Sequence, residues 1–119
     1  RWRQRGQATV EVAFLLPILA LLLLGLIQIG LVVRAKVLTV HAAREAARAA
    51  AVDDDPAAAA ATSGLAAGRY TVTVELSGER VVATVSYVDP TNVPLIGALL
   101  PDVTLTSRAV MRHEDWPTE

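Results

Sequence analysis

The side chains that could do chemistry in this sequence are few and lie far apart. The chain has two histidines, His41 and His113, and no cysteine. No His-x3-His pair or Gly-x-Ser-x-Gly elbow is present, and the glycine-containing stretch at residues 64–68 lacks the Lys-Ser/Thr of a phosphate loop. We therefore expect no catalytic residue and no cofactor, and the chain is not expected to be an enzyme.

Three consecutive carboxylates, Asp53, Asp54 and Asp55, are the densest group of potential metal ligands. A calcium loop needs ligands at alternating positions and a glycine at its sharp turn, and this stretch has neither. A solvated turn is favoured over a metal site, so no bound metal is expected.

Bulk charge excludes one class of partner. The formal net charge is -1, whereas phosphate recognition needs a surplus of Lys and Arg on one surface. We expect no nucleic-acid partner, and the absence of a catalytic constellation predicts no small-molecule substrate.

Residues 12–33 form an apolar run without a charge, in which Gln28 is the single polar side chain. As a helix this run would be about 33 Å long, which matches the ~30 Å hydrocarbon thickness of a bilayer and exceeds a secretory signal core. The alternative is a buried helix of a large soluble protein, but the rest of the chain is too small to surround it. A single-pass transmembrane helix is predicted.

Charge around the run favours a cytoplasmic N-terminus. Arg1, Arg3 and Arg5 precede it without an acidic residue among them, although cations also follow it. No convincing signal-peptidase site follows, so the segment is expected to be retained in the cytoplasmic membrane, with residues 53–119 outside. Because the sequence begins with Arg1 rather than Met, we also expect that a short leader has been trimmed or is missing.

Gly6 and Glu11 lie five positions apart, directly before the apolar run and behind the basic residues. This arrangement resembles a type IV prepilin signal. Together with Pro17 and the Ala-Ala-Arg repeat of the following helix, residues 5–52 are similar to the TadE-like family of the tight-adherence (Flp) pilus system. One departure is Gln28, where many relatives would carry an acidic residue.

The resemblance implies a processing site and a set of partners. Prepilin peptidase would cut between Gly6 and Gln7, so that residues 1–6 are a cytoplasmic leader and Glu11 is retained. Other pilin or pseudopilin subunits, the pilus assembly platform and membrane lipid are the implied partners.

A physical role for Glu11 follows from the new terminus. Cleavage would leave a positive amine on Gln7, and an amine or a carboxylate buried alone in a helical bundle is costly. Pairing Glu11 with the Gln7 amine of a neighbour would neutralise both and fix the axial register. The alternative is an interfacial Glu placed against the positive end of the helix dipole.

Four further residues of the span bear on helix shape and packing. Pro17 removes a backbone donor and predicts a local kink. Gly25 and Gly30 could allow close contact between helices, and Gln28 could bond across helices in a multimer or to its own backbone. These residues are expected to act in packing rather than in chemistry.

Beyond the membrane the helical pattern continues without a breaker to residue 52, so one helix over residues 7–52 is predicted. Its exposed half, residues 34–52, carries an apolar stripe that should pack against the outer domain. The stripe consists of Val33, Val37, Val40, Ala43, Ala47 and Ala50.

The remaining segments predict an α+β domain over residues 53–119. Asp55 as an N-cap and Pro56 open a short helix to about Ala67, with Gly68 as its stop. Alternating residues predict a hairpin over residues 70–87 that turns at Ser77 and Gly78, and a third strand over residues 103–111. A three-stranded antiparallel sheet packed on the long helix follows, with a turn at residues 95–100 and a frayed tail from His113.

Taken together, these features predict a TadE-like pseudopilin or minor pilin that acts in assembly or initiation of a tight-adherence pilus. A signal-anchored binding module, in which the helix is only a tether, is the alternative. The two differ in whether the mature protein begins at Gln7.

Overall fold

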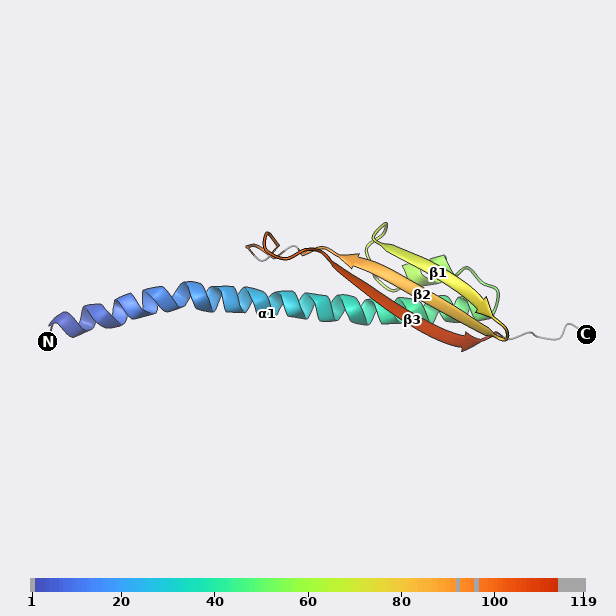
Figure 1. The fold of residues 1–119 in the computed structure, drawn as a ribbon, viewed down its shortest axis with the longest axis horizontal. Coiled ribbons are helices and arrows are strands. Elements are labelled where there is room, and N and C mark those ends of the chain that lie inside the picture. The colour runs from blue at the N-terminus through green and yellow to red at the C-terminus, as the bar shows by residue number, and fades with distance from the viewer. Residues whose placement is uncertain (1, 92, 96, 114–119) are drawn as a thin grey trace, which may run out of the picture.

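The computed structural model describes the backbone of residues 2–91, 93–95 and 97–113, and the side chains of these same residues from residue 6 onward. Its elements are α1 (Trp2–Ala51), α2 (Pro56–Ala61), β1 (Tyr70–Ser77), β2 (Arg80–Asp89) and β3 (Val103–Arg112). The molecule measures 94 × 22 × 21 Å, because α1 projects far beyond the small domain that packs on its C-terminal half (Figure 1). The predicted α+β architecture is confirmed.

Helix α1 is continuous over 50 residues and contains Pro17. It begins earlier than expected, so that residues 2–6 are helical too, and its axis bends gently in the blue part of Figure 1. It ends after Ala51, one residue before the predicted end. There Asp53 takes a left-handed φ of 57° and the Asp54 N–H donates to the Ala49 carbonyl at 2.8 Å, which caps the helix.

Helix α2 starts as predicted but is shorter. The Asp55 carboxylate accepts hydrogen bonds from the N–H groups of Ala57 and Ala58, and Pro56 occupies the first turn. The helix ends at Ala61 rather than near Ala67. The hydroxyls of Thr62 and Ser63 donate back to carbonyls in the last turn, and Gly64 follows at φ 86°, so the chain leaves the helix there.

The sheet has the order β1-β2-β3 and is antiparallel throughout. The first hairpin turns one residue later than predicted, because Ser77 pairs with Arg80 and leaves Gly78 and Glu79 as the loop. Gly78 supplies the positive φ, 62°, that a tight hairpin turn requires. The inward residues of β3 alternate with exposed ones as predicted, and Ser107 at its centre is buried.

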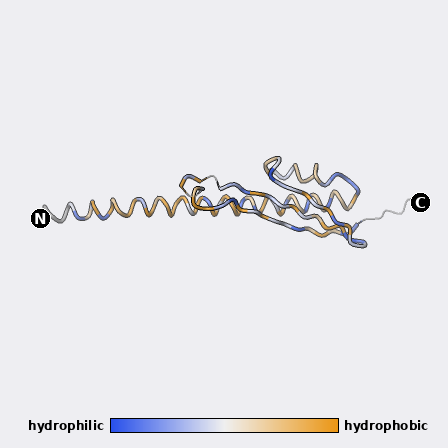
Figure 2. Tube along the Cα trace, turned by 45° about the horizontal axis from the view of Figure 1, so that its top comes forward, coloured by the Kyte–Doolittle hydropathy of each residue, from blue (hydrophilic) through white to orange (hydrophobic). Residues whose placement is uncertain are grey.

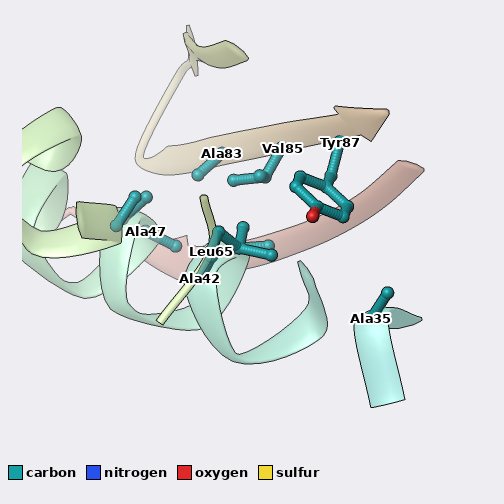
Figure 3. Close-up of a cluster of buried hydrophobic side chains, with 10 residues drawn as sticks. Ala35, Ala42, Ala47, Leu65, Ala83, Val85 and Tyr87 are labelled. Atoms are coloured by element: carbon teal, nitrogen blue, oxygen red, sulfur yellow. The ribbon is translucent and has the colours of Figure 1, made fainter. Parts of the chain in front are cut away.

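The core lies between the sheet and an alanine-rich face of α1 (Figure 3). Val81, Val85 and Thr39 are its largest fully buried side chains. The predicted stripe on α1 is partly wrong, because Val33 and Val37 are 57% and 62% exposed. Alanines and a threonine are buried instead, since small side chains let the sheet approach the helix closely. The buried members of this face are Ala35, Thr39, Ala42, Ala43, Ala46 and Ala47.

Two contacts, one in the middle of α1 and one just beyond its C-terminal end, show in which direction β3 runs along the helix. The Lys36 ammonium donates to the Thr106 carbonyl and, at 3.2 Å, to the Ser107 hydroxyl. Beyond the last strand His113 lies 3.4 Å from Asp53, and its N–H donates to the Glu79 carbonyl at 2.7 Å. β3 therefore runs in the same direction as α1. The predicted frayed tail does not include His113, and the rest of that tail lies outside the described residues.

The segment between β2 and β3 is a closed loop, here called the β2–β3 loop (residues 90–102). The Thr91 N–H donates to the Asp102 carboxylate at 3.2 Å, and the Thr91 hydroxyl donates to the Pro101 carbonyl at 3.1 Å. Within the loop the Gly97 N–H donates to the Val93 carbonyl at 2.8 Å. The predicted turn is present, and the loop extends from the sheet back along α1 toward its N-terminus (Figure 1).

Candidate functional site

The N-terminal half of α1 is an apolar rod with almost no cover from the rest of the chain. Large hydrophobic side chains are exposed all around it; Phe14 is 73% exposed and Leu19 is 62% exposed. Figure 2 shows this hydrophobic stretch running clear of the domain. Among the described residues, α1 is the one helix long and apolar enough to cross a membrane. A helix that is apolar on every side must be surrounded by lipid or by other helices.

The predicted processing residues lie at the free end of this rod. Gly6, Gln7 and Glu11 are all exposed. Gln7 and Glu11 are four residues apart on one helix, so they lie on the same face. Because α1 begins at Trp2, Glu11 lies well beyond the first turn, where the helix dipole has little effect. This weakens the dipole explanation for Glu11 in the uncut chain.

The glycines of the N-terminal half of α1 have open space around them within the chain. A Cβ built on Gly6, Gly25 or Gly30 would meet nothing within 4 Å outside the adjacent helix backbone. The chain's own fold therefore does not require glycine at these positions. Close contact with another helix at Gly25 and Gly30 stays a prediction.

Gln28 differs from its surroundings. It is 7% exposed and is the one buried residue among residues 6–34. Its Oε1 atom is buried without a hydrogen-bond partner among the described residues. The side chain is thus covered by protein, and its carbonyl oxygen accepts no hydrogen bond within the described chain. The predicted bond across helices in a multimer stays a prediction.

An open cleft of about 440 Å³ lies where the domain meets the end of the apolar run. Leu31 and Arg34 from α1 line it together with Arg69, Asp89 and Pro90 from the domain. Burial raises the pKa of the Asp89 carboxyl above its usual value; nearby Arg69 lowers that pKa and Asp102 raises it. The cleft holds charges of both signs but no nucleophile beside a base.

The residues first considered for chemistry are not brought together. His41 is exposed on α1, whereas His113 contacts Asp53 at the far end of the domain. Asp53, Asp54 and Asp55 are exposed and serve the turn between the helices, where Asp54 accepts the Asp55 N–H at 2.8 Å. No group of three potential metal ligands occurs in the part of the chain that the structure describes.

Two features were missed by sequence analysis. One is the anchoring of Lys36 to β3, which no local pattern signals. The other is the extension of the β2–β3 loop along α1 toward its N-terminus, since only a turn was predicted there; the absence of charge in residues 90–101 was a detectable signal.

The rod and its charged end have a counterpart in a known family. A family model described as TadE-like protein matches residues 6–48. The predicted resemblance is confirmed over this segment. The TadE-like segment begins at the predicted cleavage glycine and ends just after Ala47, the last residue of the alanine face that seats the sheet, so the sheet itself lies outside it. Comparisons with curated proteins and with solved structures gave no match.

Proposed function

We propose that this protein is a pseudopilin or minor pilin that acts in assembly or initiation of a tight-adherence pilus after cleavage between Gly6 and Gln7. The match of residues 6–48 to the TadE-like family carries the proposal, because it spans the prepilin-like signal and the helix together. The role is structural rather than enzymatic. The implied partners are prepilin peptidase, other pilin subunits and the assembly platform.

The apolar surface of α1 is compatible with a subunit that moves from the membrane into a filament. An apolar rod suits lipid before assembly and neighbouring helices after it, since both offer apolar contact. With its N-terminus in the cytoplasm, Gly6 would lie where the peptidase acts. The domain would stand outside the membrane.

Glu11 is the residue proposed to direct assembly. Its carboxylate would pair with the Gln7 amine of a neighbouring subunit as the rods slide past one another. Removing one partner of a buried ion pair typically costs about 3 to 5 kcal/mol. That cost is large enough to decide whether a subunit is incorporated.

Two measurements test the proposal. Mass spectrometry of protein purified from the membrane should show an N-terminus at Gln7, and Gly6→Ala should slow that processing without preventing insertion. Glu11→Gln should be inserted and processed but should fail to enter or initiate pili, as judged by surface pili and by co-purified pilus components.

The competing function is a signal-anchored binding module, with the sheet exposed and the helix as a tether. A mature protein that retains residues 1–6, or normal piliation with Glu11→Gln, would favour it. Normal processing of Gly6→Ala would contradict the role given to Gly6.

A further inference from the structure

We propose that the β2–β3 loop inserts into the outer surface of the lipid bilayer beside α1, as a second membrane contact of this chain. The inference rests on the proposed membrane-spanning role of α1. It adds a lipid-binding surface to the domain, at a position remote in sequence from the transmembrane segment.

The loop lies at the level of the apolar run. Asp89 and Pro90, at its root, line the same cleft as Leu31 and Arg34 of α1. From there the loop extends toward the N-terminus of α1, as both tube and ribbon show (Figures 1 and 2). Whatever surrounds α1 at this level also surrounds the loop.

The burial of side chains along α1 shows how far toward its N-terminus the outer domain covers the helix. The face that seats the sheet continues past Arg34 through half-buried Val32, buried Gln28 and half-buried Leu24. These positions are spaced by about one helical turn, so they form one stripe. Asp89, the last residue of β2, lines the same cleft as Arg34, so the sheet ends near that level of the helix. The β2–β3 loop extends beyond this level along α1 (Figure 1), and we infer that it covers Gln28.

The expected depth agrees with interfacial insertion. Gln28 precedes Arg34 by six residues, which corresponds to about 9 Å along the helix. If Arg34 lies at the headgroups, the loop reaches about that far below them. Interfacial segments are typically buried by about 5–10 Å.

The outer surface of the loop suits lipid. Leu95, Leu99 and Leu100 are 65%, 78% and 52% exposed, while Thr91 and Val93 are turned inward and buried. No charge occurs in residues 90–101. Leucine side chains gain free energy when they leave water for an apolar environment, and the hydrocarbon of the bilayer offers that environment.

The backbone of the loop is also adapted to partial desolvation. Irregular backbone is costly in lipid because unpaired N–H groups lose water. Here Pro90, Pro94 and Pro101 have no N–H, and the N–H groups of Thr91 and Gly97 are hydrogen-bonded within the loop. These features lower the cost of a shallow position, where water still reaches the remaining groups.

The cations at the root of the loop complete the pattern. Arg34 and Arg69 line the cleft at the root of the loop, beside Asp89 and Pro90. Guanidinium groups at that height match the phosphates of the outer leaflet. Apolar residues below and cations above are the arrangement that a bilayer surface selects.

Site-directed spin labelling of the full chain in phosphatidylcholine vesicles tests the proposal. The sequence has no cysteine, so single cysteines can be introduced without a background. Leu99→Cys reports on the loop, and Leu76→Cys, 71% exposed at the opposite end of the sheet, is the matched control. Leu22→Cys reports on the span. Each labelled variant is checked for native circular dichroism.

Lipid insertion predicts that the ratio of oxygen to nickel-chelate accessibility at Leu99 resembles that at Leu22 and is several-fold above that at Leu76. A lipid-like Leu22 with a water-like Leu99 would overturn the loop proposal and leave the span intact. A label at Leu99 shielded from both reagents would indicate a protein contact, such as a second copy, and would also overturn it. A water-like Leu22 would refute the span itself.

Discussion

Replacing Val85 by Ala tests whether the sheet is seated on α1 as described. Val85 is fully buried at the centre of β2, where it pairs with Val72 of β1 and Ser107 of β3. The loss of two methyl-sized groups removes about 1.6 kcal/mol of hydrophobic stabilisation. The facing residues of α1 are mostly alanines, which are too short to fill the space, so a cavity adds to the cost. The expected total is about 2–3 kcal/mol.

The measurement is urea unfolding in detergent micelles, followed by near-ultraviolet circular dichroism, to which Tyr87 next to this position contributes. In thermal unfolding of a domain of this size, the same loss of stability corresponds to a fall in melting temperature of about 10 °C or more. Val110→Ala is the matched control, because Val110 is 54% exposed on β3 and should lose less than about 1 kcal/mol. Equal midpoints for the two variants would refute the packing of β2 on the alanine face.

Three further substitutions probe the domain. Asp55→Ala removes the N-cap of α2 and should cost about 1 kcal/mol, seen as a lower urea midpoint; no change would mean that α2 does not need its cap. Gly97→Ala would place a Cβ against the Thr91 carbonyl oxygen, so the loop must shift; a cost of about 1–3 kcal/mol is expected, and an unchanged melting curve would contradict the loop geometry. Burial raises the folded-state pKa of Asp89 above its unfolded value, so its ionisation destabilises the domain as pH rises through the normal carboxyl range; Asp89→Asn should raise the melting temperature at neutral pH, with the gain vanishing at low pH, and a pH-independent difference would contradict this.

Local periodicity was enough to predict the strands and the long helix. Alternation in residues 70–76, 81–87 and 103–111 identified all three strands, because one face of an antiparallel sheet is buried and the other is solvated. The cap at Asp55 was equally visible, since capping depends on neighbouring residues alone. The turn at Gly78 was misplaced by one residue because pairing register depends on the partner strand.

The packed face of α1 could not be predicted in the same way. Valines at positions 33 and 37 are more hydrophobic than the alanines beside them, yet they point away from the sheet. Close approach of a sheet to a helix favours small side chains, and hydrophobicity alone does not report that geometry. The end of α2 was missed because the hydroxyls of Thr62 and Ser63 compete for its last carbonyls. The burial of Gln28 was missed as well, because it stands in an otherwise exposed apolar run and no local pattern marks one polar side chain there as covered.

The continuity of α1 ties the orientation of the domain to that of the span. No linker separates the apolar run from the first buried alanine, Ala35, so a rotation of the rod turns the sheet by the same angle. One residue inserted just before Arg34 would turn the domain by about 100° and move it outward by about 1.5 Å relative to the span. The β2–β3 loop would then face a different side of the helix than Gln28. The rotation of the apolar half of α1 among lipids or neighbouring subunits therefore decides in which direction the sheet of the outer domain faces.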